Sequence, residues 1–99
     1  MESRFIGKVC MFRTYSAGVH FGELVKMQEK KAIVKDSRRI YYWEGACSLS
    51  QLSNDGSKNI SSCKIAQSLD EILLTEVIEV IPMRSKAIES LNSAKNWEV

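Results

Sequence analysis

Residues 13–22, R-T-Y-S-A-G-V-H-F-G, contain the turn around which we expect the fold to form. The segment begins as a strand, breaks into a small polar turn at residues 15–18, and returns as a strand. Gly18 suits this turn because glycine takes a positive φ without a steric penalty. The segment therefore predicts two strands that continue outward in both directions along the chain.

Alternating apolar and polar residues predict four strands around this turn. Downstream of it, Val19, Phe21, Val25 and Met27 share one parity, with Leu24 as the exception, which indicates a half-buried strand. Four short strands joined by tight turns are typical of an antiparallel sheet that curls into a small barrel. The predicted strands are 5–12, 19–27, 32–35 and 39–43, with connections at 28–31 and 36–37.

The most apolar segment, residues 72–81, carries opposing signals. Ser68 and Glu71 have capping-box spacing, which favours a helix. The many β-branched residues of the segment favour a strand instead. We predict a buried central strand over residues 73–81, ended by Pro82, and keep the helix as the alternative.

The remaining residues predict two helices and a loop. The expected elements are a helical turn at 48–52 capped by Cys47 or Ser48, a mobile serine-rich loop at 54–62, and a helix at 86–94 capped by Ser85. Trp97 either seals the core or makes a dimer contact, and we favour the seal. The predicted fold class is mainly β (α+β), in a single domain of residues 1–99. It has a small antiparallel curled sheet or barrel-like core, one short middle helix and a C-terminal helix.

Composition places the chain among ordinary globular proteins, since 44% of its 99 residues are hydrophobic and 26% are charged. Fourteen Lys and Arg against twelve Asp and Glu give a net charge of +2, too balanced to indicate a nucleic-acid binder by charge alone. Cys10, Cys47 and Cys63 lack metal-ligand spacing, so neither a metal nor a cofactor is expected. Unpaired thiols, with no visible signal peptide and no long apolar run, indicate a cytoplasmic protein without membrane contact.

The sequence offers no catalytic constellation. His20 is the single histidine, and Cys10 and Cys47 lie in apolar, strand-like surroundings that make reactive thiolates unexpected. Ser16 lacks the G-x-S-x-G context of a serine nucleophile, and no glycine-rich phosphate loop precedes a helix. We therefore expect a protein that binds a ligand and is not an enzyme.

Two stretches, residues 13–22 and 38–46, both combine arginine, aromatic and small residues. Guanidinium groups form planar forks that suit phosphate, aromatic rings provide faces on which a base can stack, and small residues let backbone N–H groups approach a ligand. We expect the two stretches to converge on one nucleotide-binding surface. In the alternative interpretation the rings belong to the core and the arginines are solvated. The predicted ligand-binding residues are Arg13, Tyr15, Ser16, Ala17, Gly18, His20, Arg38, Arg39, Trp43, Gly45 and Ala46, with further rings at Tyr41 and Tyr42.

The segments R-T-Y-S-A-G-V-H-F-G, R-R-I-Y-Y-W-E-G-A-C-S-L-S-Q-L and I-L-L-T-E-V-I-E-V-I-P resemble a family of small proteins encoded by phages and prophages. The resemblance covers residues 8–97, and the first motif is the most specific. The chain also resembles the phage sponge proteins that defeat Thoeris immunity. This resemblance implies a non-catalytic anti-defence protein of the host cell cytoplasm that sequesters a cyclic ADP-ribose signal. It also implies dimers or higher oligomers with pockets at subunit contacts.

The expected function is that of a sponge that binds a small nucleotide signal without cleaving it. The signal would be a cyclic ADP-ribose isomer or a cyclic oligonucleotide. A chain this short has little room for an enclosed pocket of about 300 Å³ or more, so we expect a homo-oligomer with a shared pocket. Two alternatives remain. One is a small β-barrel that binds single-stranded RNA or DNA, and the other is a protein-interaction module that inhibits a host factor.

Overall fold

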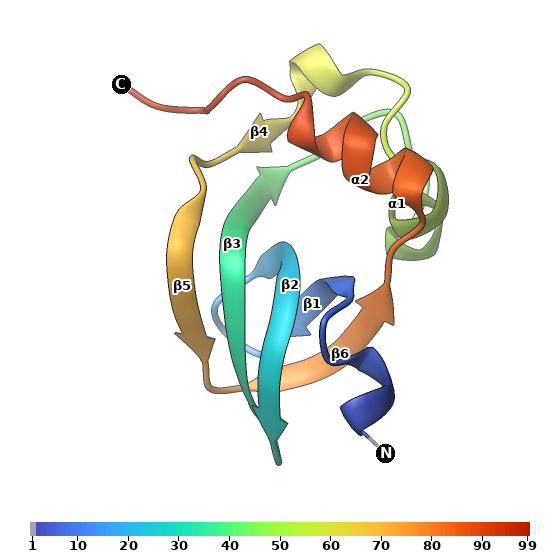
Figure 1. Cartoon of the computed structure of the whole chain (residues 1–99). Helices are drawn as coiled ribbons and strands as arrows, with labels where there is room; N and C mark the ends of the chain where they lie inside the picture. Colours follow the sequence, from blue (N-terminus) through green and yellow to red (C-terminus); the bar gives the residue numbers. More distant parts are fainter. Residues whose placement is uncertain (1) are drawn as a thin grey trace.

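One curled antiparallel sheet carries the fold of residues 2–99, the part of the chain that this computed structural model describes (Figure 1). The strands are β1 (Val9–Thr14), β2 (Val19–Gln28), β3 (Lys31–Tyr42), β4 (Lys64–Ile65), β5 (Leu69–Leu74) and β6 (Val77–Pro82). The helices are α1 (Leu49–Asp55) and α2 (Ser85–Asn92), with 3₁₀ turns at Glu2–Phe5 (η1) and Ile60–Ser62 (η2). The predicted class, a mainly β fold with a middle and a C-terminal helix, is confirmed.

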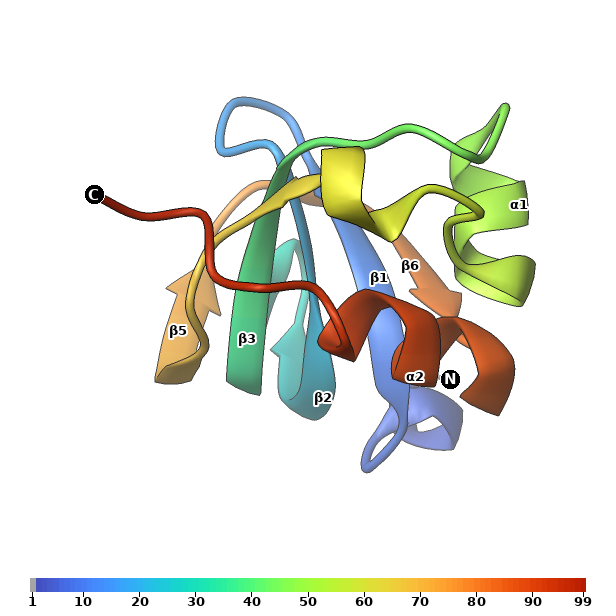
Figure 2. The ribbon, with the colours of Figure 1, turned by 90° about the horizontal axis from the view of Figure 1, so that it is seen from above.

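The strand order explains why the sheet curls. Neighbouring strands run in the order β4-β3-β2-β1-β6. Strand β5 pairs with residues 32–37 of β3, ahead of the part of β3 that pairs with β4. Only Thr75 and Glu76 join β5 to β6, although these strands lie toward opposite edges of the sheet. The sheet must therefore bend until its edges approach each other, as Figures 1 and 2 show. Two hydrogen bonds attach the β5–β6 connection to the turns of the β1–β2 and β2–β3 hairpins. Tyr15 N donates to the Glu76 carbonyl over 2.9 Å. Val77 N likewise donates to the Lys30 carbonyl over 2.9 Å.

The hairpin predicted from residues 13–22 forms between β1 and β2. Thr14 closes its turn, because the backbone N–H and the hydroxyl of Thr14 both donate to the Gly18 carbonyl, over 3.0 and 2.8 Å. Gly18 has the expected positive φ of 82°. The strand upstream of the turn begins at Val9 and not at residue 5, because residues 2–5 form the 3₁₀ turn η1.

Strand β3 continues through a position that we predicted as a turn. The backbone stays extended through residues 36–37, with Asp36 in the left-handed region at a φ of 52°. The register between β2 and β3 shifts by one residue between Phe21 and Glu23, so Asp36 is the extra residue of a β-bulge. The predicted turn is wrong because a bulge absorbs the same local signal without ending the strand.

The bulge reverses which parity of β3 faces which side of the sheet. Before it, Ala32 and Val34 belong to the same core cluster as Phe12. Beyond it, Ile40 belongs to the cluster of Met11, on the opposite face. A prediction that assumes uninterrupted alternation therefore fails beyond the bulge.

Strand β2 has a second irregularity at Val25, where the register shifts between Leu24 and Lys26. Phe21 packs on the face of the sheet that carries the helices, whereas Leu24 and Met27 pack against the cluster on the other face. The predicted common face for Val19, Phe21, Val25 and Met27 is therefore wrong. Leu24, the exception in the sequence pattern, follows the regular alternation, and the irregularity at Val25 brings Met27 to the face of Leu24.

The apolar segment 72–81 is extended, as predicted, but it does not form one central strand. A turn at residues 75–76 divides it between β5 and β6, which lie toward the two edges of the sheet. Leu73 and Ile78 are about half exposed, so the prediction of a buried strand is wrong. Strand β6 ends at Pro82, where the ring removes a backbone donor.

Two hydrophobic clusters lie on the two faces of the sheet. One contains Cys10, Phe12, Leu24, Ala32, Val34, Leu74 and Val77. The other lies beneath the helices and contains Met11, Phe21, Ile40, Leu52, Ile65 and Leu91. Burial raises the pKa of the Cys10 thiol to about 11, so this cysteine is an inert core residue. No helix within residues 2–99 is long and apolar enough to cross a membrane.

The helices begin close to their predicted starts and lie on the same side of the sheet (Figure 2). Ser48 caps α1, since its hydroxyl accepts from Gln51 N over 3.1 Å. The predicted cap of α2 at Ser85 is wrong. The helix begins at Ser85, one residue earlier than expected, so Arg84 occupies the cap position. Hydrogen bonds hold the loop predicted as mobile, including Ser57 N to Ser90 Oγ over 3.0 Å.

Candidate ligand-binding site

The two stretches expected to form the site lie side by side in the sheet. Their strands, β2 and β3, pair antiparallel, so that His20 is opposite Arg39 and Phe21 is opposite Arg38. Because side chains alternate along a strand, the two adjacent arginines point to opposite faces. The two stretches are therefore neighbours in the sheet, but their side chains are divided between its two faces.

Arg38 holds the fold together on the side of the helices. Its buried guanidinium donates to four backbone carbonyls and one side-chain amide. These acceptors are Ala66 O (2.8 Å), Leu91 O (3.2 Å), Ala94 O (3.1 Å), Ile65 O (3.4 Å) and Asn96 Oδ1 (3.2 Å). They belong to the end of β4, the C-terminal end of α2 and the chain that follows it. Arg38 was predicted to bind ligand, but its placement gives it a structural role.

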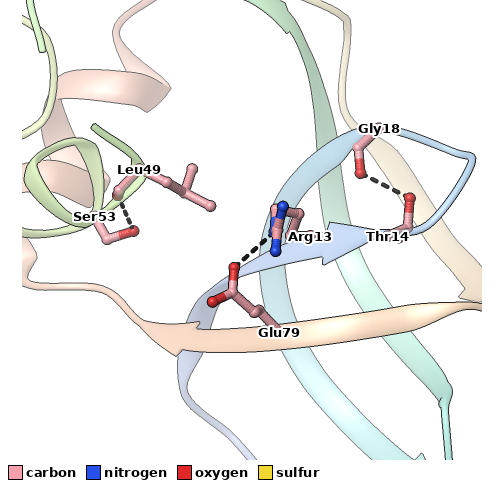
Figure 3. Close-up of polar contacts among 6 residues, drawn as sticks. All are labelled: Arg13, Thr14, Gly18, Leu49, Ser53 and Glu79. Atoms are coloured by element: carbon pink, nitrogen blue, oxygen red, sulfur yellow. Dashed lines mark hydrogen bonds and ion pairs between the residues drawn. The ribbon is translucent and has the colours of Figure 1, made fainter. Parts of the chain in front are cut away.

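Arg13 and the residues at the tip of the turn after it make contacts with β6 and the connection in front of it. Arg13 Nε forms an exposed ion pair with Glu79 Oε1 over 2.7 Å, between β1 and β6 (Figure 3). Ser16 Oγ donates to Glu76 Oε1 over 2.5 Å, and the Tyr15 ring is largely exposed at the tip of the turn. The structure does not bring Arg13, Tyr15, Ser16 or Gly18 to the cavity described below.

Trp43, Gly45 and Ala46, which follow β3, are partly buried against neighbouring segments. Trp43 and Ala46 contact the core cluster beneath the helices. Gly45 takes a φ of 83°, and a Cβ at this position would lie 2.6 Å from Lys58 N and 2.5 Å from Asn59 N. These three residues were predicted to approach a ligand. In the structure they connect β3 to the loop in front of β4.

The remaining candidates border a cavity of about 250 Å³ on the face opposite the helices. Its lining comes from β2, β3, β5 and the connection between β4 and β5. The lining residues are His20, Ser37, Arg39, Tyr41, Ala66, Gln67, Leu69 and Ile72. Larger depressions lie at the tip of the β2–β3 hairpin and beside α2, but neither contains an aromatic ring or a buried polar side chain.

His20 is a buried, neutral hydrogen-bond acceptor in the lining of this cavity, with only 1% of its surface exposed. Its Nε2 lies 2.9 Å from the Ala17 carbonyl, which can only accept, so the proton is on Nε2 and the lone pair is on Nδ1. Burial lowers the pKa of His20, the bond to Ala17 opposes this, and the charge of Arg39 adds to the lowering. The imidazole is therefore uncharged at neutral pH.

Ser37 contributes the second polar group of the lining. It is 1% exposed, and its Oγ is a buried side-chain polar atom without a hydrogen-bond partner within residues 2–99. Buried hydroxyl groups are nearly always paired, so this unpaired group requires an explanation. Ser37 Oγ is not hydrogen-bonded to His20.

Aromatic and cationic side chains extend outward from Arg39 and Tyr41, which line the cavity. We call the group of Arg39, Tyr41, Tyr42, Lys64 and Trp97 the rim cluster. The Arg39 guanidinium lies 5.7 Å from the centre of the Tyr41 ring, and the Tyr41 and Trp97 rings are 5.0 Å apart. Lys64 Nζ lies 5.5 Å from the Trp97 ring and 5.8 Å from the Tyr42 ring. The rim cluster therefore alternates positive charge with half-exposed aromatic surface.

We predicted that Trp97 seals the core. This is wrong, because half of its side chain is exposed. Its backbone N–H donates to the Ile65 carbonyl over 2.8 Å, and Asn96 pairs with Ile65 as a short parallel bridge. This pairing holds the chain after α2 against β4. It places the Trp97 ring against Tyr41 and next to the cavity.

Sequence reasoning missed Trp97, the polar residues Ser37, Lys64 and Gln67, and the apolar lining residues Ala66, Leu69 and Ile72. Ser37 was assigned to a turn, and the bulge that turns its side chain into the cavity depends on pairing with β2. Lys64 and Gln67 lie in a segment without periodicity. An unusual signal was present only at Trp97, a large ring among polar residues near the chain end.

No group of three or more His, Cys, Asp or Glu side chains in residues 2–99 could hold a metal ion. The donors at the cavity are instead an imidazole nitrogen, a hydroxyl, an amide and a guanidinium. Such groups bind a polar organic ligand through hydrogen bonds, with stacking and phosphate contacts available on the rim.

Comparisons with known proteins give a family but no described relative. No curated protein matches the chain. No solved structure matches it. One family model matches residues 7–91, which include all six strands described above and most of α2. Because this match covers most of the sequence, the chain belongs to the family described as a domain of unknown function, DUF6948.

Proposed function

We propose that this protein binds a small nucleotide signal at the cavity and releases it unchanged, as a sponge. The observation that carries the proposal is that the Arg39 guanidinium, the Tyr41 ring and an unpaired buried hydroxyl line one cavity, with the Trp97 ring tilted against Tyr41 beside it. Stacking of a base on an aromatic side chain contributes about 1–3 kcal/mol. A charged hydrogen bond from Arg39 to phosphate contributes about 1.5–3 kcal/mol.

The dimensions of the cavity limit how the nucleotide fits. A volume of about 250 Å³ is below the roughly 300–1,000 Å³ of pockets that enclose a whole organic ligand. One part of the nucleotide therefore enters the cavity, and the rest lies on the rim cluster. A second subunit placed over the rim would enclose the exposed part, which is the homo-oligomer that the motif resemblance implies.

Sequestration of an immune signal requires tight binding and no catalyst. The motif resemblance to phage proteins that defeat Thoeris immunity supports a cyclic ADP-ribose isomer as the signal, with a cyclic oligonucleotide as the other candidate. In this role the protein acts in the host cell cytoplasm, at a concentration above that of the signal. The buried, uncharged His20 supports binding because it forms no pair with a nucleophile.

A capture experiment tests this function. The protein is incubated with cyclic ADP-ribose isomers and cyclic dinucleotides, washed and heat-denatured, and the released compounds are identified by mass spectrometry. We expect one compound to be recovered intact by the wild type and to be reduced at least tenfold in Tyr41→Ala and Arg39→Ala. Arg13→Ala is the matched control, because this arginine is paired with Glu79 away from the cavity. Recovery of an altered compound would instead indicate an enzyme, and no capture of any compound would refute nucleotide binding.

The rim cluster also favours a second candidate, binding of single-stranded RNA or DNA. Tyr41, Trp97 and Tyr42 expose their rings beside Arg39 and Lys64, which is the combination that single-strand binders use. The two candidates differ in their response to salt. An oligonucleotide contacting many phosphates loses affinity steeply between 50 and 200 mM salt, whereas a cyclic nucleotide with two or three phosphates shows a shallow slope.

A further inference from the structure

We propose that the cavity recognises the uncharged end of its ligand, a base edge or a ribose diol, and that the phosphate remains outside at Arg39. In this arrangement the ligand donates a hydrogen bond to His20 Nδ1 and shares another with Ser37 Oγ. The inference rests on the proposed nucleotide binding and states which end of the nucleotide enters.

Ser37 provides the first reason. Its hydroxyl is buried, lines the cavity and has no partner in the part of the chain that the structure describes. It follows directly after Asp36, the left-handed residue of the bulge, and if the strand alternated regularly through Asp36 the Ser37 side chain would face the helices. Bulges next to binding sites commonly redirect a side chain in this way. The backbone thus departs from regular geometry and turns an unpaired hydroxyl toward the cavity.

His20 provides the second reason, and it determines the charge of the group that enters. The Ala17 carbonyl fixes the proton on Nε2, so the ring can only accept a hydrogen bond at Nδ1. A phosphate at neutral pH carries negatively charged oxygens that would face this lone pair in a buried site. A base N–H or a ribose hydroxyl donates to the same lone pair without bringing charge into the cavity.

The position of Arg39 completes the argument. Arg39 is partly exposed at the edge of the cavity, with its guanidinium over the Tyr41 ring. Lys64 lies farther along the rim, beside Trp97. Positive charge therefore lies at the edge of the cavity and beyond it, while the other polar groups of the lining are neutral. A nucleotide matches this division because its phosphate and its base are at different ends.

Two substitutions at the cavity distinguish recognition from a structural role. Ser37→Ala removes only the unpaired hydroxyl, so we expect an unchanged or higher Tm together with a roughly five- to tenfold loss of affinity for the captured compound. His20→Gln places an amide N–H near the position of Nε2, which keeps the bond to Ala17 and removes the Nδ1 acceptor. We expect a similar loss of affinity, whereas His20→Asn, which keeps an acceptor near Nδ1, retains more of it. Ser16→Ala is the control hydroxyl, since Ser16 pairs with Glu76 outside the cavity.

Fragment binding, followed by the ¹⁵N resonances of the His20 ring, tests which end of the nucleotide enters. The probes are adenosine and uridine, the free bases adenine and uracil, ribose, and inorganic phosphate. We expect Nδ1 to shift with the nucleosides and not with phosphate. The free bases and ribose separate a base edge from a ribose diol as the group that enters.

The outcomes separate this inference from the proposed function. If the wild type captures a nucleotide but Ser37→Ala and His20→Gln bind it with wild-type affinity, the orientation is wrong and the function stands. A shift of Nδ1 with phosphate alone likewise reverses the orientation. If the wild type captures no nucleotide and no probe moves Nδ1, both the function and the inference are wrong.

Discussion

At the scale of the residue, two neighbouring arginines with the same chemistry have different tasks. Arg38 is buried beneath α2 and donates to carbonyls from three parts of the chain. Arg39, one position later, lies at the cavity rim over Tyr41. Sequence reasoning grouped them because both precede an aromatic run. Only their positions on opposite faces of β3 separate them.

The first prediction compares these two residues. Arg38→Met removes the side-chain donor of the part-buried carbonyls of Ala66 and Ala94, and we expect the free energy of unfolding to fall by at least about 1–3 kcal/mol, the cost of one such group. Arg39→Met should change it by no more than about 0.5 kcal/mol, as is usual at a surface position, because the partly exposed Arg39 donates to no backbone carbonyl. Urea unfolding measures both. Equal destabilisation by the two substitutions would contradict the division of roles.

His20 predicts how stability depends on pH. Burial lowers its pKa in the folded state below the ordinary value of 6.5, so the unfolded chain takes up a proton first as the pH falls. Stability should therefore be complete above pH 6.5 and decline as the pH falls from 6.5 toward the lowered pKa. Thermal unfolding of the wild type and of His20→Gln across this range gives the contribution of His20 by difference. Parallel profiles for the two proteins would show that His20 titrates normally.

At the scale of the element, local signals predicted the helices and turns better than the faces of the strands. Ser48 was identified as a cap because capping depends on residues three positions apart. The bulges at Val25 and Asp36 were missed because they depend on pairing between β2 and β3. Each bulge changes the face of the residues that follow. The site residues Ser37 and Tyr41 therefore could not be assigned to the cavity from alternation alone.

Gly22 carries the prediction for the β2–β3 pair. A Cβ at this position would lie 2.7 Å from Val34 Cγ1, 2.8 Å from the Lys35 carbonyl and 3.0 Å from Ser37 Cα. Two of these three atoms belong to the backbone of the bulged strand and cannot move independently. We expect Gly22→Ala to cost about 1–3 kcal/mol of stability, as overpacked cores do. Chemical denaturation measures it, and an unchanged midpoint would show that the bulge can open without cost.

At the scale of the whole molecule, sequence reasoning found the class of fold and the two stretches that meet, but not the geometry of the site. The mainly β class follows from strand and turn signals along the chain. The curl of the sheet follows from the two-residue connection between β5 and β6, which periodicity showed only as one long apolar segment. Trp97 joins the rim because the chain after α2 returns to β4. Such contacts between distant segments leave no local pattern.

Asp36 is the residue by which β3 exceeds its partner strand, because Lys35 and Arg38, three positions apart, lie opposite Glu23 and Phe21, which are two positions apart. A chain lacking Asp36 would therefore pair regularly, with Arg38 still on the face of the helices and Arg39 still on the face of the cavity. Family members that are one residue shorter at this point should be aligned with the gap at Asp36. A gap placed after Arg38 would match residues that lie on opposite faces of the sheet.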